Sequence, residues 1–203
     1  HDNVRRFAIS RRDVCHWHYI AIRLLETKIM AGKIDVEAAM ADAAQYIVGP
    51  EEAEDMLKRL REKAAYMDAF EESDYEVLAN TLDFLRFQPN DPLVTKGEDA
   101  SWCGFIMEGS VGVVVNGKQV AAMPAGKLIG GMAYFFGATR TADCCGGENG
   151  GVLAAIEFNA LRELEKNSPD VALRFINCIA TGELENLLSR ISRMEGKCAD
   201  ETC

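Results

Sequence analysis

Several features that define other protein classes are missing from this chain of 203 residues. No apolar run approaches the roughly 20 residues of a membrane-spanning helix, and no signal-peptide pattern opens the sequence. The seven cysteines include no C-x-x-C pair, which favours free thiols in a reducing compartment, so we expect a cytoplasmic protein. The net charge of −10 and the lack of a basic patch argue against binding to nucleic acid.

Catalytic and metal-binding patterns are also scarce. The chain has three histidines, and no nucleophile elbow, P-loop, kinase motif or usefully spaced carboxylate pair accompanies them. The segment Cys15-His16-Trp17-His18 has the residue types of metal ligands. Residues two apart on a helix do not share a face, however, and no second ligand pair follows. We therefore expect neither an enzyme nor a metal site, and no bound cofactor.

The composition, with 48% hydrophobic and 27% charged residues, is ordinary for a soluble globular protein, and the length allows one domain with a helical extension. Residues 1–72 are interpreted as an arginine-rich leader followed by helices at 17–29, 36–47 and from Pro50. Glu51 and Glu52 after Pro50 favour a helix start there. The apolar stripe of this third helix is Ala53, Met56, Leu57, Leu60, Ala64 and Met67.

Residues 73–195 are predicted to form one domain. A capped helix is expected to begin within residues 73–76, with Leu78, Leu82 and Leu85 facing inward. Short β-forming runs follow, and Asn116-Gly117 between two of them predicts a two-residue hairpin. Residues 146–151, which are rich in glycine, are expected to form a flexible loop. The predicted fold class is α+β, with a jelly-roll-like β-roll of about eight short strands over residues 88–158.

Helical periodicity returns over residues 159–195. Asn159 and Ser168-Pro169 are candidate helix caps. One long apolar stripe is predicted to face inward or toward a partner, and it comprises Phe175, Ile176, Ile179, Leu184, Leu187, Leu188 and Ile191. Residues 196–203 are interpreted as a polar tail.

The most informative segment is residues 129–142, which we call the cassette. A glycine turn at Gly130 and Gly131 leads into Met132-Ala133, and such a turn points backbone N–H groups at an anion. Arg140 follows in the same segment, and its planar guanidinium suits the two free oxygens of a cyclic phosphate.

This segment resembles the phosphate-binding cassette of the cyclic-nucleotide-binding domain family, whose usual form is F-G-E-L-A-L, a spacer, then P-R-A-A. Lys96-Gly97-Glu98 is similar to an early turn of that family, and residues 105–113 are similar to its Y-x-I-x-x-G-x-V-x-V strand pair. The resemblance covers residues 75–192 and implies a sensor whose C-terminal helices move when phosphate binds. It implies ligand contacts from Gly130, Gly131, Met132, Ala133, Arg140 and Thr141, with cAMP, cGMP or a nucleoside as candidate ligands.

The cassette departs from the family pattern. Gly131 stands where the family has a glutamate that accepts the ribose 2′-OH, and hydrogen bonds to charged groups are worth roughly 1.5–3 kcal/mol, so the loss weakens binding by about 10- to 150-fold. Thr139 replaces the family's proline. Asp143 is expected near the phosphate unless it points away, and Glu108 or Glu148 is a candidate replacement for the missing carboxylate. A cassette that binds nothing stays open as an alternative.

A second resemblance lies in the leader. Arg5-Arg6-Phe7-Ala8-Ile9 is similar to the pseudosubstrate, R-R-x-A-I/V, of regulatory subunits of cAMP-dependent protein kinase. It implies a kinase catalytic subunit as partner, with Arg5 and Arg6 pairing with acids, Ala8 replacing the phosphorylated residue and Ile9 filling an apolar pocket. An exposed basic tail is the alternative interpretation.

The predicted function is a regulatory, non-enzymatic protein that senses a cyclic nucleotide or related ligand weakly and transmits this to a partner protein. The alternative is a ligand-free interaction scaffold, in which the fold is kept for shape and the N-terminal helices or the stripe of residues 175–191 bind another protein.

Overall fold

A computed structural model describes residues 48–200. The predicted helices at 17–29 and 36–47, the Cys15–His18 segment and the leader lie outside these residues. The predicted boundary between residues 72 and 73 stays a prediction.

The first helix, α3 (Pro50–Arg61), begins as predicted. Pro50 occupies its first turn together with Glu51 and Glu52, where negative charge stabilises the helix dipole. The helix ends at Arg61, and a 3-10 helix, η2 (Ala65–Ala69), follows. All six residues of the predicted stripe are buried, so the stripe is a packing face.

The next helix, α4 (Glu72–Thr81), differs from the prediction at both ends. Its N-cap is Glu71, and the N–H of Glu71 donates to Asp74 Oδ2 at 2.8 Å in a capping box. The helix therefore starts before Ser73, because the carboxylates at both ends of the box satisfy its first N–H groups. Leu82 caps the C-terminus and Leu85 lies in the following strand, so neither belongs to the helix.

One antiparallel sheet with a roll-like shape follows. Its main path is β1 (Asp83–Phe87), β6 (Asp143–Glu157), β3 (Trp102–Val115) and β4 (Lys118–Pro124), while β2 (Pro92–Val94) pairs with β6 and β5 (Leu128–Ile129) pairs with β3. Strand β1 starts before residue 88, where the roll was expected to begin. The predicted α+β class is confirmed.

The sheet has six strands in the described part of the chain rather than about eight, because β3 and β6 are each one long, continuous strand. Residues 146–151, expected as a loop, lie within β6. Register shifts at Ile106/Glu108 and Gly109/Val111 bend β3 without ending it. At this bend a Cβ on Gly109, whose φ is +75°, would overlap the carbonyl oxygen of Gly150, so glycine lets the two strands pass closely.

The predicted hairpin is confirmed. Val115 pairs with Lys118 across the turn, and φ is +52° at Asn116 and +74° at Gly117. Two successive positive φ angles are typical of a type I′ turn, whose twist matches that of the strands.

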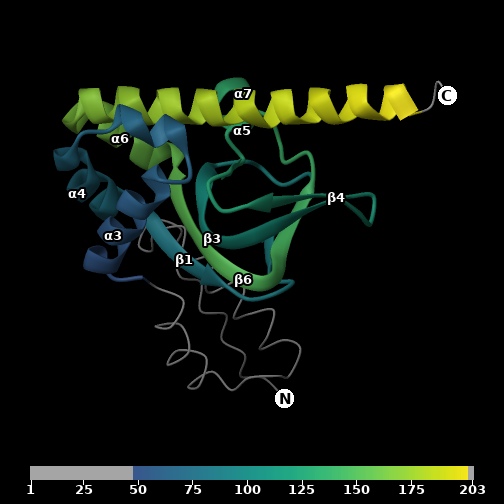
Figure 1. Cartoon of the computed structure of the whole chain (residues 1–203). Helices are drawn as coiled ribbons and strands as arrows, with labels where there is room; N and C mark the ends of the chain where they lie inside the picture. Colours follow the sequence, from purple (N-terminus) through teal and green to yellow (C-terminus); the bar gives the residue numbers. More distant parts are fainter. Residues whose placement is uncertain (1–47, 201–203) are drawn as a thin grey trace, which may run out of the picture. The chain divides into compact units, whose positions relative to one another are not determined.

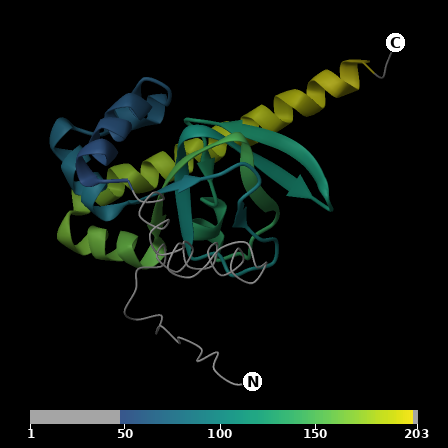
Figure 2. The ribbon, with the colours of Figure 1, turned by 90° about the horizontal axis from the view of Figure 1, so that it is seen from below.

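Three helices complete the described chain: α5 (Met132–Phe136), α6 (Phe158–Asn167) and α7 (Pro169–Asp200). Figure 1 shows α7 running along one side of the roll, with α5 next to it. Seen from below in Figure 2, the C-terminal half of α7 extends past the strands. The helix passes Gly196, where the sequence predicts the polar tail to begin.

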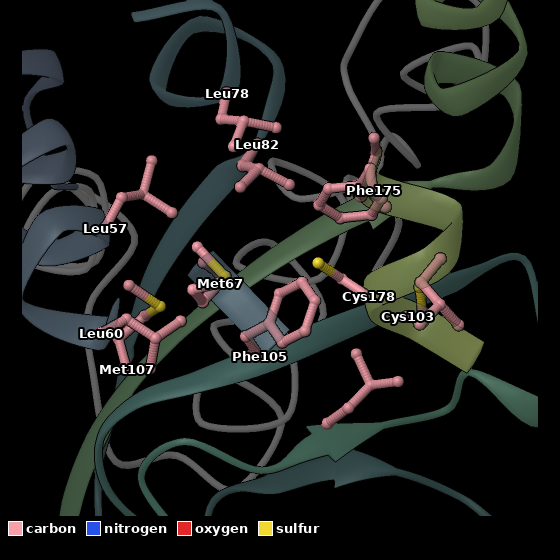
Figure 3. Packing of buried hydrophobic residues seen from close by; sticks show 14 of the residues in the cluster. Leu57, Leu60, Met67, Leu78, Leu82, Cys103, Phe105, Met107, Phe175 and Cys178 are labelled. Carbon is pink, nitrogen blue, oxygen red and sulfur yellow. The ribbon is translucent and has the colours of Figure 1, made fainter. Parts of the chain in front are cut away.

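The core joins the roll to α3, α4 and the first half of α7 (Figure 3). Phe105 of β3 lies 5.5 Å, centroid to centroid, from Phe175 of α7 in an edge-to-face arrangement, and 5.6 Å from Tyr66. Cys178 donates a hydrogen bond from Sγ to the carbonyl oxygen of Tyr66. These contacts hold the N-terminal half of α7 against the roll and η2, and this positions the later turns of α7 over the cassette.

Candidate functional site: the cassette and its cover

The cassette connects β5 to β6 through a turn, α5 and a second turn. Gly130 has a φ of +79° and is half-buried, Gly131 is the buried N-cap of α5, and Ala133 is buried behind it. Met132 and Thr141 are exposed. The second turn begins at Gly137, whose φ of +60° ends the helix.

Arg140 is the centre of charge in this segment, and it is 7% exposed. Its Nη2 donates to the carbonyl oxygen of Trp102 at 2.8 Å, and its guanidinium carbon lies 4.4 Å from the Trp102 ring centroid, within range of a cation–π interaction. Nη1 is buried and has no hydrogen-bond partner among the residues that the structure describes. Burial lowers the pKa of Arg140 from its ordinary value, although a guanidinium keeps its proton in proteins.

Gly130 and Arg140 are brought together as the sequence predicts. A Cβ on Gly130 would overlap Arg140 Nη1, so the guanidinium lies directly on the glycine backbone. The turn at Lys96-Gly97-Glu98 supports the same residue from its other side, because the N–H of Arg140 donates to the carbonyl oxygen of Glu98 at 2.9 Å and the N–H of Gly97 to that of Arg140 at 2.8 Å.

Gly131 faces α7. A Cβ at this position would lie 2.6 Å from Leu128 Cδ2 and 2.8 Å from both Glu183 Oε1 and Ile179 Cγ2. The N–H of Met132 donates to Glu183 Oε1 at 3.1 Å. Burial raises the pKa of Glu183, while backbone hydrogen bonds from Met132 and Gly131 act in the opposite direction. A carboxylate from α7 thus lies next to the position at which the resemblance expects a glutamate of the cassette itself.

Neither hydrogen bonds nor ion pairs connect the other acids proposed for this region to Arg140 within the described residues. Asp143 Oδ1 accepts a hydrogen bond from the N–H of Lys96 at 2.8 Å. Glu108 forms a long ion pair with Arg59, at 3.9 Å, and Glu148 is exposed on β6.

Glu183 is the functional candidate that sequence reasoning missed. It follows Phe175 and Ile179 at intervals of four residues, so it lies on the inward face of α7, where a carboxylate is unexpected. This irregularity in the stripe was the available signal. Trp102, which holds Arg140, belongs to no motif.

The predicted stripe on α7 is inward only in its first part. Phe175 and Ile179 are buried, while Leu184, Leu187, Leu188 and Ile191 are 42–61% exposed. Helix α5 adds Met132, Phe135 and Phe136, which are 44–71% exposed. Apolar side chains therefore remain exposed both on α5, within the cassette, and on α7, which contacts it.

Among the residues whose side chains the structure describes, which end at residue 192, no group of three or more His, Cys, Asp or Glu residues is placed to hold a metal ion. Over the same part of the chain, no helix is both long enough and apolar enough to cross a membrane.

No protein-family model matches the chain. A cGMP-dependent protein kinase of Toxoplasma gondii is 30% identical over 95 residues, which is 47% of this chain and 10% of that protein. A cyclic-nucleotide-binding domain from Methylobacillus flagellatus superposes with a TM-score of 0.63 at 20% identity, covering 78% of this chain and 89% of that one. A putative cyclic nucleotide-binding protein from Geobacter metallireducens gives a TM-score of 0.54 at 17% identity, covering 70% and 99%. The described residues therefore have the fold of the cyclic-nucleotide-binding domains, the family that the cassette resembles.

Proposed function

We propose that this chain is a regulatory, non-enzymatic module that binds a cyclic nucleotide or related nucleoside ligand weakly through the cassette and passes the signal to a partner protein. Gly130, Gly131, Met132 and Ala133 supply backbone contacts in this proposal. Arg140 supplies the positive charge that pairs with the phosphate, and Thr141 next to it is a further ligand contact.

The observation that carries the proposal is the unpaired Nη1 of Arg140. Within the described residues, this guanidinium is buried and donates to a carbonyl oxygen and no carboxylate. Burying a charge without a counter-ion costs free energy, and an anion bound beside Gly130 offsets that cost. Trp102 and the Glu98 carbonyl hold the side chain and backbone of Arg140 in place before any anion arrives.

The relatives support the same class of ligand and partner. The matched segment belongs to a cGMP-dependent kinase, and the similar structures are named for cyclic-nucleotide binding. Since the segment is about a tenth of that kinase, a kinase partner is part of the proposal. The proposal also includes a contact between this kinase and Arg5, Arg6, Ala8 and Ile9. A peptide of residues 1–12 tests that contact. The peptide should inhibit a cAMP-dependent kinase catalytic subunit, and the version with Arg5 and Arg6 changed to Ala should not.

Thermal unfolding with cAMP, cGMP and nucleosides at about 1 mM tests ligand binding. A ligand at 100 times its Kd adds about 2.7 kcal/mol, a Tm increase of about 5–11 °C for a chain of this size. Arg140→Gln should abolish the shift, whereas Arg162→Gln, an exposed arginine on α6, should keep it. An equal shift in both variants would remove Arg140 from the proposal.

The second candidate is a ligand-free interaction scaffold. The four exposed apolar residues of α7, between Leu184 and Ile191, favour it, because uncovered apolar groups of this kind are typical of protein-binding surfaces. No Tm shift with any nucleotide, together with binding of a partner that is lost in Leu187→Ser, would select the scaffold.

A further inference from the structure

Glu183 contacts the cassette as part of a wider attachment of α7. We define the latch as α7 residues 182–186 and the segment of residues 127–132 that they touch. Besides the bond from Met132 to Glu183, Asn186 Nδ2 donates to the carbonyl oxygen of Leu128 at 3.1 Å. Lys127 Nζ lies 3.1 Å from Glu185 Oε2. Three polar contacts therefore hold one turn of α7 on the residues that lead into the cassette.

Two glycines make this close approach possible. A Cβ on Gly182 would lie 3.3 Å from Leu128 Cβ, and a Cβ on Gly131 would be closer still to Leu128, Ile179 and Glu183. Leu128 and Ile179 are 1% and 0% exposed, so neither has room to move aside. Because the family's glutamate cannot fit at residue 131 while α7 is in this position, Gly131 is explained by the packing of α7 as well as by loss of a ligand contact.

The latch leaves the two charges of the site unpaired with one another. Glu183 accepts from the cassette backbone, whereas Arg140 faces Trp102 and Gly130. Both charges act on the buried thiol of Cys103, whose pKa burial raises to about 12, with Arg140 lowering it and Glu183 raising it. The cassette thus carries a free cation at one end and, at the other, N–H groups already bonded to an internal carboxylate.

Building on the proposed function, we propose that Glu183 is an internal competitor of the ligand: its carboxylate occupies the backbone of the cassette at Met132, and an anionic ligand must displace it to bind. Since Glu183 is part of α7, displacing it opens the latch and frees the turn of α7 that carries Leu184 and leads to Leu187. The apparent affinity for the ligand equals the affinity of the open form multiplied by the fraction of molecules in which the latch is open. Glu183 therefore sets the sensitivity of the site and links it to α7.

Glu183→Ala in the full chain tests this inference, with Glu163→Gln, a change of an exposed glutamate on α6 outside the latch, as the control. Amide hydrogen exchange without ligand reports the latch. In Glu183→Ala, exchange at Met132 and along residues 180–190 should rise about tenfold, as expected when a charged acceptor is lost, while the Met132 amide of Glu163→Gln should exchange as in the wild type. Unchanged exchange in Glu183→Ala overturns the inference.

Titration with cAMP and cGMP is the second readout. The inference predicts binding about 3- to 10-fold tighter in Glu183→Ala than in the wild type. Weaker binding overturns it, because Glu183 would then contact the ligand in place of the missing glutamate. Faster exchange with no binding by either protein supports the latch and refutes the proposed function alone.

Discussion

Gly130 and Gly131 are adjacent residues of one turn, yet the structure requires glycine at each for a different reason. Gly130 has a φ of +79°, and a side chain there would overlap Arg140 and approach the Trp102 carbonyl oxygen at 3.1 Å. Gly131 has a φ of −66°, which any residue adopts, and its constraint comes from α7. Gly130 leaves room for the Arg140 guanidinium, and Gly131 leaves room for α7.

The difference shows that one sequence feature can have two physical origins. By the family pattern, Gly131 replaces a glutamate and so removes a contact to the ribose. In the structure it is also the point where a helix from a distant part of the chain reaches the cassette, bringing Glu183 with it. The following predictions test whether the two glycines are as different as this.

The largest effect is expected for Gly130→Ala. An L-residue in the left-handed region costs about 1–2 kcal/mol, and displacing the buried guanidinium adds to this. We expect stability to fall by about 2–3 kcal/mol, a Tm decrease of roughly 4–12 °C, measured by calorimetry. A variant as stable as the wild type would show that Arg140 does not lie on Gly130.

Gly131→Ala should cost less, about 1–2 kcal/mol, because the strain is steric overpacking with no backbone term. Part of the clash is with Glu183 Oε1, so the two changes should not be additive. In the Glu183→Ala background the cost of Gly131→Ala should shrink by at least about 0.5 kcal/mol, as measured by urea unfolding. Strict additivity would contradict the contact between these residues.

The smallest effect is expected on the exposed face of α7 beyond the latch. Leu188→Ser changes a side chain that is 61% exposed, and such surface changes usually stay within about 0.5 kcal/mol. Urea unfolding of Leu188→Ser should therefore match the wild type. A loss of several kcal/mol would mean that this face of α7 is covered in solution.

Local signals predicted much of the fold. The turn at Asn116-Gly117 is determined by nearby residues, and its prediction was confirmed. The stripe from Ala53 to Met67 is buried, but only its first four residues lie on α3, because that helix ends at Arg61. The glycine-rich run within β6 misled the prediction, because glycine weakens strand propensity but here allows two strands to pass closely. Pairing with β3 keeps these residues in strand conformation. The sequence of one strand alone does not show which strand it will pair with.

The same division applies to the candidate site. Arg140 and Gly130 lie ten residues apart in one motif, so their proximity could be predicted. Glu183 lies 51 residues after Met132 in the sequence, and only tertiary packing reveals the contact between them. Its position in the inward stripe was visible, but the sequence did not show which surface it faces.

The most direct test of the central claim, that the cassette binds a cyclic nucleotide beside Arg140, is an NMR titration of the 15N-labelled full chain with cAMP and cGMP up to about 1 mM, a concentration that fills a site of micromolar affinity. The account predicts that the amide signals of Gly131, Met132 and Ala133 shift in a saturable way while that of Gly117 in the hairpin stays in place. If all four signals stay unchanged with both nucleotides, or if they shift equally in Arg140→Gln, the claim is contradicted.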